Sequence, residues 1–104
     1  MRRANIFLVS KKVGILCEYS FSHYDFTYDQ SYIGQPISMT MPLRSDSYEF
    51  DSFPPFFEGL LPEGVRLESF LRQTKIDRND LFSQLIAVGE DLVGAVTVKV
   101  EEGA

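Results

Sequence analysis

The first part of the chain alternates apolar and polar residues with the period of a β-strand. Residues 4–9 carry apolar side chains on both faces, which predicts a strand covered on both sides. A turn at residues 10–12 separates it from residues 13–19, which place one set of side chains on a single face: Val13, Ile15, Cys17 and Tyr19. The two segments together predict a β-hairpin.

Three further stretches have the pattern of strands. In residues 21–28, one face collects Tyr24, Phe26 and Tyr28. Residues 37–41 alternate Ile37, Met39 and Met41 with Ser38 and Thr40, which predicts a half-buried strand closed by Pro42. Residues 48–50 predict one more short strand.

The pattern then changes to that of a helix, and the rest of the chain is organised around this stretch. Five large apolar residues occur at i, i+3, i+4, i+7 and i+8: Phe53, Phe56, Phe57, Leu60 and Leu61. Asp51 or Ser52 is expected to cap the helix, and two prolines suit its first turn. Pro62 is expected to end or bend it, because proline has no N–H group to donate.

Two more helices and a strand complete the pattern. A helix over residues 62–73 has an apolar stripe of Leu67, Phe70 and Leu71. A third runs over residues 79–88, and it is expected to begin with a cap at Asp77 or Asn79 and to end at a left-handed Gly89. Residues 95–100 alternate Val96, Val98 and Val100 with polar residues and predict a last strand, and residues 101–104 are expected to fray.

Strands followed by helices and a returning strand indicate the α+β class. We expect one small domain over residues 1–104, with a mainly antiparallel sheet packed on one face by two or three short helices. The last strand can rejoin the sheet only by crossing over after the helices.

Composition and charge narrow the classes of function. The 104 residues carry a net charge of −5, so nucleic-acid binding, which depends on Lys and Arg, is not expected. The chain has no apolar run of membrane-spanning length, so no contact with a membrane is expected. The single cysteine cannot form an internal disulfide, which fits a reducing cytoplasm.

The residues that could take part in catalysis or metal binding are explained more simply by structural roles. His23, the only histidine, is expected to be exposed on a strand, and Cys17 is expected to be a buried core thiol. The pairs Asp77/Asp80 and Glu90/Asp91 are explained by a helix start and a turn. Within residues 89–94, the two glycines at the ends have the spacing found in a phosphate-binding loop. However, Ala95 and Val96 stand where such a loop has Lys and Ser/Thr. We therefore expect no enzyme, metal or cofactor, and residue chemistry alone indicates a binding module.

Several motifs together resemble a known family. They are Gly59-Leu60-Leu61-Pro62-Glu63-Gly64 with Arg66, then Asp80-Leu81-Phe82, then Gly89-x-Asp91-x-x-Gly94-Ala95-Val96. Earlier segments agree: Val13-Gly14-x-Leu16, Phe26-x-Tyr28-Asp29-x-x-Tyr32, and residues 36–43 ending Met41-Pro42-Leu43. In order and spacing, the chain resembles the N-terminal subdomain of HipA-type toxin kinases over nearly its whole length.

The resemblance implies a function without catalysis. In that family the ATP-binding loop, the catalytic aspartate and the metal ligands lie in the kinase core, and no residue of this chain matches them. In split HipBST toxin–antitoxin systems, a small protein, HipS, is similar to this subdomain and acts as the antitoxin. A separate HipT chain carries the Ser/Thr kinase, and a HipB-like chain binds DNA. The resemblance therefore implies a HipS-like antitoxin that binds and inhibits a HipT-type kinase.

The expected contact with the kinase lies on the second helix. Its outward side carries Val65, Arg66, Glu68 and Ser69, which are also explained as solvated helix positions. Two other functions stay open: the N-terminal subdomain of a longer HipA-like kinase, and a non-inhibitory scaffold that links the kinase to its DNA-binding repressor. An enzyme of its own class is a distant third.

Overall fold

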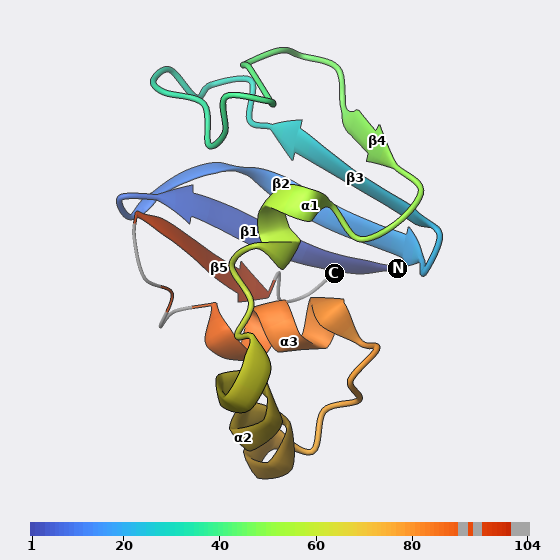
Figure 1. Cartoon of the computed structure of the whole chain (residues 1–104). Coiled ribbons are helices and arrows are strands. Elements are labelled where there is room, and N and C mark those ends of the chain that lie inside the picture. The colour runs from blue at the N-terminus through green and yellow to red at the C-terminus, as the bar shows by residue number, and fades with distance from the viewer. Residues whose placement is uncertain (90–91, 93–94, 101–104) are drawn as a thin grey trace.

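Five strands, three helices and one returning crossover make up the fold (Figure 1). The structure is a computed structural model, and it describes residues 1–89, 92 and 95–100. Within these residues the elements are β1 Arg2–Leu8, β2 Lys11–Ser20, β3 His23–Tyr28, β4 Tyr48–Phe50, α1 Pro55–Glu58, α2 Gly64–Thr74, α3 Leu81–Val88 and β5 Val96–Val100.

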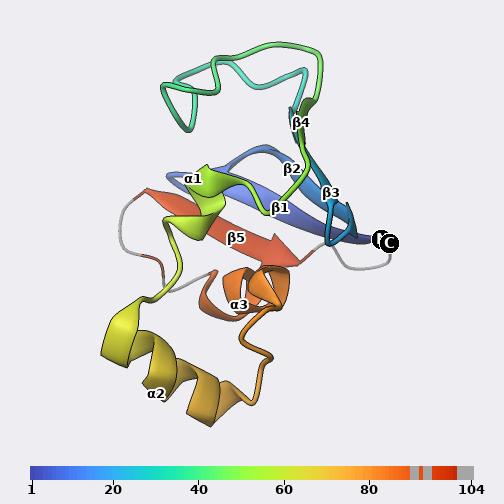
Figure 2. The same cartoon turned by 45° about the vertical axis from the view of Figure 1, so that its right-hand side comes forward.

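The strands form one antiparallel sheet in the order β4-β3-β2-β1-β5. β5 follows the three helices and pairs with β1 at the edge opposite β4, so the predicted crossover is confirmed. Figure 2 shows that the helices lie on one side of the sheet. The α+β prediction, an antiparallel sheet with short helices on one face, is confirmed.

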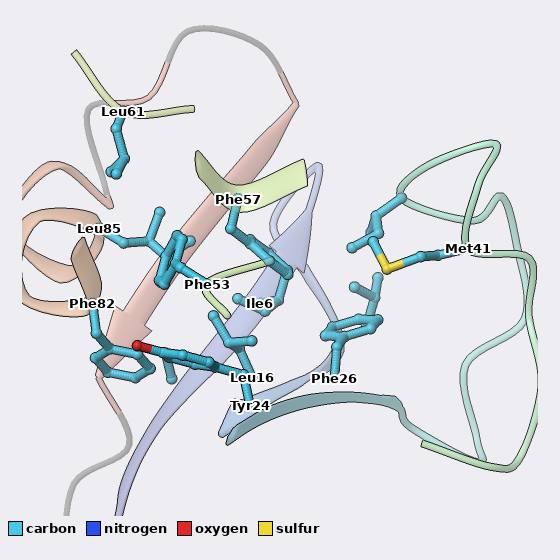
Figure 3. Packing of buried hydrophobic residues seen from close by; sticks show 14 of the residues in the cluster. Ile6, Leu16, Tyr24, Phe26, Met41, Phe53, Phe57, Leu61, Phe82 and Leu85 are labelled. Atoms are coloured by element: carbon cyan, nitrogen blue, oxygen red, sulfur yellow. The ribbon is translucent and has the colours of Figure 1, made fainter. Parts of the chain in front are cut away.

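The core lies between the sheet and the segments that cover its helical side (Figure 3). The predicted inward face of β3 is confirmed, since Tyr24, Phe26 and Tyr28 are all buried. Opposite them lie the stripe of the central helix and the inner side of α3. The largest fully buried hydrophobic side chains are Phe26, Phe57, Phe82, Ile6, Leu16, Leu85, Val13 and Val98.

A β-bulge changes which side of β2 is buried. Ile6 pairs with Gly14 and Phe7 pairs with Lys12, so Val13 is an extra residue on β2. Val13 is buried, but beyond it the buried positions are Gly14, Leu16 and Glu18. The predicted face of Val13, Ile15, Cys17 and Tyr19 is therefore wrong, because the bulge shifts the alternation by one residue.

Gly14, next to the bulge, lets β3 approach closely. A Cβ atom there would lie 2.4 Å from the carbonyl oxygen of Thr27 and 2.9 Å from the Phe26 ring. A larger residue at this position would push β2 away from β3.

The outer face of the sheet differs from its inner face. Ala4 and Ile6 of β1 are fully buried on the inner face, while Asn5 and Phe7 on the outer face are only half-buried. No helix among the described residues packs on this outer face (Figure 2). The prediction of a strand at residues 4–9 covered on both sides therefore holds for one side only. The chain also turns at Val9 and Ser10, one residue earlier than expected.

Residues 37–41 form a turn, and the strand predicted there is wrong. The backbone N–H of Met41 donates to the carbonyl of Ser38 at 3.1 Å, and the Ser38 hydroxyl accepts from the Thr40 N–H at 3.2 Å. Such local bonds compete with a strand. Ile37 and Met41 point into the core, while Met39 between them is 98% exposed.

The helix predicted from the apolar stripe at residues 53–61 is shorter in the structure than that stripe. α1 starts at Pro55 with Pro54 as the N-cap and has no side-chain cap, so neither Asp51 nor Ser52 caps it. Beyond Glu58 the chain continues in tight turns, with N–H groups of residues 60 and 61 donating three residues back. The stripe nevertheless reaches the core, where Phe53, Phe57 and Leu61 are buried.

The start of α3 also differs from the expected caps. Asp80 caps it, and its carboxylate accepts from the Ser83 N–H at 3.1 Å, in place of Asp77 or Asn79.

The end of α3 is held by close backbone contact with β5. Gly89 keeps right-handed helical angles, so the predicted left-handed cap is wrong. A Cβ on Gly89 would lie 2.1 Å from the carbonyl oxygen of Val98, and the Val98 N–H donates to the Gly89 carbonyl at 2.9 Å. Glycine is therefore required by close packing.

Candidate partner-binding site

α2 stands apart from the rest of the molecule. None of its residues is buried, and in both views it projects beyond α3, away from the sheet (Figures 1 and 2). Helices in proteins gain most of their stability from packing an apolar face. An amphipathic helix with so little packing is the feature of this molecule best suited to meet another chain.

The contacts that hold α2 are weak. Its predicted stripe of Leu67, Phe70 and Leu71 is only half-buried. The Glu68 carboxylate meets the Arg78 guanidinium at 2.6 Å, and both side chains are more than half exposed. Exposed ion pairs of this kind contribute little to stability.

A groove of about 620 Å³ lies beside α2. Its walls come from the end of the central helical stretch, from α2 and from the last turn of α3. Its lining includes Leu60, Leu61, Arg66, Phe70, Ala87 and Val88. Glu63 and Arg66 are the charged residues that the described structure places on its lining. The groove therefore combines apolar side chains with polar surface, including one acidic and one basic group, which suits a protein partner.

The structure separates the four residues predicted to touch a partner. Val65 is 84% exposed, and Arg66 lies at the groove. Glu68 is paired with Arg78, and Ser69 is half-buried. They belong to one helix, but only Arg66 lines the groove.

Sequence reasoning did not find the α3 side of the groove. Ala87 and Val88 come together with Leu60 and Leu61 only in the folded chain, far apart in sequence. The signal for the near side was present, because Leu60 and Leu61 precede the helix-breaking Pro62.

A charged cluster fixes the start of α3 on the sheet. The Arg2 guanidinium donates to Glu18 at 2.7 Å, to Asp80 at 2.9 Å and to the Ser83 hydroxyl at 2.7 Å. The Tyr24 hydroxyl completes it by donating to Glu18 at 2.9 Å. The groups satisfy one another, so the cluster is structural.

The same cluster shifts the acidity of Asp80. Burial alone would raise the pKa of this carboxyl, but hydrogen bonds from Arg2 and Ser83 outweigh burial and hold its pKa below the usual value. Asp80 thus acts as a charged helix cap, as expected of a helix start. The other carboxylate pair, Glu90/Asp91, and the glycine-spaced segment at 89–94 lie largely outside the described residues.

The two candidate nucleophilic or basic groups are not assembled into a site. His23 is exposed on β3, as predicted, and its Nε2 lies 2.8 Å from a Glu49 carboxylate oxygen. Cys17 lies half-buried on the outer sheet face, so its assignment to the core is wrong. Burial, followed by the charge of Asp25, raises the pKa of the thiol and keeps it protonated.

The described residues hold neither a metal site nor a membrane-spanning helix. No group of three or more His, Cys, Asp or Glu side chains is placed to hold a metal ion. No helix there has the length and apolar character needed to cross a membrane.

Comparison with known proteins identifies the domain. The family model for the HipA N-terminal domain matches residues 4–99. A solved structure of the N-terminal domain of HipA toxin has a TM-score of 0.78 and 28% identity, and the match covers 100% of this chain and 96% of that chain. A Haemophilus influenzae protein whose name states no function is 30% identical over 102 residues, which is 98% of this chain and 95% of the relative. The chain belongs to the HipA N-terminal domain family.

Proposed function

We propose that this protein is a HipS-like antitoxin, which binds and inhibits a separate HipA-like Ser/Thr kinase of the HipT type. It acts in the cytoplasm as a binding protein and carries out no reaction of its own. The observation that carries the proposal is the membership of residues 4–99 in the HipA N-terminal domain family. The match covers 95% of the Haemophilus influenzae relative, so in that protein a domain of this kind makes up nearly the whole chain.

The proposed mode of binding follows from the missing N-terminal domain of such a kinase. A kinase without its own N-terminal domain exposes the apolar surface that this domain covers. A free copy of the domain docks there through an interface of standard size, about 800 Å² per partner. The groove supplies partly exposed apolar side chains and the outward side of α2 supplies an exposed helix, and both gain burial when a partner covers them.

Arg66 is the residue on α2 with the best-defined role in this proposal. It lies at the groove beside Phe70 and pairs with an acidic or carbonyl group of the kinase. Val65 provides an exposed apolar contact, and Glu68 and Ser69 lie at the rim of the interface. A charged rim group such as Glu68 affects the rate of association more than the affinity.

The test is made with a purified HipA-like kinase that lacks an N-terminal domain of its own. Calorimetry measures binding, and transfer of labelled phosphate from ATP measures kinase activity at equal concentrations of the two chains. We expect tight binding and loss of kinase activity. Arg66→Glu should weaken binding by at least about tenfold, because it places a like charge against the partner. The matched control is Arg72→Glu, an exposed arginine six positions along the same helix.

Two other outcomes contradict the proposal and identify the alternatives. Binding that leaves kinase activity unchanged indicates a scaffold, and adding the HipB-like DNA-binding chain then tests whether the three proteins assemble. No binding by the folded wild-type protein indicates a domain that belongs to a longer HipA-like kinase. Equal affinities for Arg66→Glu, Ser69→Glu and wild type would remove α2 from the interface.

A further inference from the structure

The connection between β3 and β4, residues 29–47, carries exposed apolar side chains that the proposed α2 site does not use. Ile33 is 84% exposed, Met39 is 98% exposed and Leu43 is 40% exposed. A single exposed apolar side chain is ordinary, but three on one connection need an explanation.

Two tyrosines of the sheet, Tyr28 of β3 and Tyr48 of β4, fasten this connection, and Tyr32 braces it from within. The Tyr28 hydroxyl donates to the Met41 carbonyl at 2.5 Å and accepts from the Ile37 N–H at 3.0 Å. The Tyr32 and Tyr48 hydroxyls donate to backbone carbonyls of residues 35 and 42. The Tyr28 and Tyr32 rings lie nearly parallel, with an interplanar angle of 8°. These bonds anchor the backbone of the connection at residues 35, 37, 41 and 42.

Met39 is held outward by this construction. Its neighbours in the turn, Ile37 and Met41, are 8% and 4% exposed and anchor both sides to the core. The Ser38–Met41 turn then places Met39 at the tip. A side chain presented on an anchored turn loses less conformational entropy on binding than one on an unanchored loop.

The charges of the chain indicate what kind of surface would cover the tip. Charged residues make up 24% of the chain, yet none occurs between Asp29 and Arg44, the longest uncharged run in the sequence. Centres of protein interfaces are depleted in charge and enriched in methionine and aromatic residues. The complementary surface is thus an uncharged, apolar pocket or groove on a protein.

The position of the connection favours the same partner that covers α2. Figures 1 and 2 show the connection, α1 and α2 one below another along one side of the molecule. Three side chains are far too few to bury the roughly 800 Å² per partner of a stable complex. The connection therefore adds to a larger interface and does not by itself hold two copies of this chain together.

We propose that residues 30–43 form a second docking surface for the HipA-like kinase, in which Met39 and Ile33 enter an uncharged apolar pocket of that chain. This inference rests on the proposed function. With this second surface, the contact with the kinase runs from α2 along one side of the molecule to the connection between β3 and β4.

The experiment compares kinase affinity among glutamate variants at exposed positions. Met39→Glu and Ile33→Glu should each weaken binding to the purified kinase chain at least about tenfold, because each places a charge in an apolar pocket. Phe21→Glu is the matched control: Phe21 is 74% exposed and precedes β3, at the opposite end of that strand. Its affinity should stay within about twofold of wild type. Circular dichroism spectra and unfolding midpoints establish that all variants fold.

The outcomes separate this inference from the proposed function. If wild type binds and inhibits the kinase while Met39→Glu and Ile33→Glu bind equally well, the second surface is wrong and the antitoxin proposal stands. If wild type does not bind, both fail. If the substitutions instead convert a dimer of this protein to a monomer in light scattering and leave kinase affinity unchanged, the surface joins copies of this chain, and the inference is overturned.

Discussion

At the scale of single residues, Asp80 connects three parts of the fold. Its carboxylate caps α3 through Ser83 and pairs with Arg2 of β1, which in turn reaches Glu18 of β2. The Arg2 guanidinium also lies over the Phe82 ring at 4.8 Å. The first turn of α3 is thus held on the sheet by charged groups as well as by the packing of its apolar side chains.

Replacing Asp80 should destabilise the protein in a pH-dependent way. Asp80→Ala should lower the free energy of unfolding by about 1–2 kcal/mol at pH 7, because the cap and the Arg2 contact are both lost. Asp80→Asn should cost less, since asparagine also caps helices. Urea unfolding of the three proteins measures both differences.

The pH dependence has a definite sign. The pKa of Asp80 is lower in the folded chain than its ordinary value of 3.8. Its charge therefore stabilises the fold above pH 3.8, and this contribution is lost as the pH falls through the folded pKa. The gap between wild type and Asp80→Asn should shrink below pH 3.8. A gap that stays constant down to pH 2 would contradict the account.

At the scale of elements, the β1–β2 hairpin has a turn whose residues do not suit its geometry. Val9 and Ser10 both have left-handed angles, with φ of 49° and 66°. Two-residue hairpin turns with positive φ at both positions strongly prefer Asn-Gly, and a β-branched residue is disfavoured there.

The double variant Val9→Asn/Ser10→Gly should therefore stabilise the protein. Val9 is 76% exposed, so little packing is lost, and its N–H bond to the Ala95 carbonyl at 2.9 Å involves only the backbone. We expect the free energy of unfolding to rise by about 1–2 kcal/mol, measured from the urea midpoint with an unchanged slope. Val9→Ala/Ser10→Ala, which keeps the steric cost, should give no such gain. An unchanged or lower midpoint for the Asn-Gly variant would rule this explanation out.

α2 is the element with the least tertiary support, and this should appear in hydrogen exchange. Because none of its residues is buried, its amides can exchange through local opening without unfolding the sheet. We expect them to exchange at least about 100-fold faster than the central amides of β1 and β2. Equal protection in α2 and β1 would show that the helix is packed more firmly than its exposure indicates.

The sequence predicted the positions of the strands and helices better than it predicted which of their faces are buried and where turns occur. Alternation located β1, β2, β3 and β5, and the five-residue stripe located the segment that covers the sheet. The errors came from local contacts that alternation does not encode. The extra Val13 shifts the faces of β2, and the Ser38 hydroxyl favours a turn over a strand. The groove escaped prediction because α2 and α3 approach each other only in three dimensions.

At the scale of the whole molecule, the fold is a small sheet with one covered face and a projecting helix (Figure 1). The core is concentrated under α1 and α3, while α2, the groove and the connection from β3 to β4 remain open along one side. A partner that covers this side would bury apolar surface that the free domain leaves exposed. The proposed binding to a HipA-like kinase needs a surface of this kind.

The measurement that tests the central claim most directly is growth of cells that express a HipA-like kinase without an N-terminal domain of its own, with and without this protein. The account predicts that growth stops when the kinase is expressed alone and returns when this protein is co-expressed. Arg66→Glu should reduce the rescue, and Arg72→Glu should not. If growth stays arrested although wild-type protein is expressed and folded, this protein is not the inhibitor of that kinase.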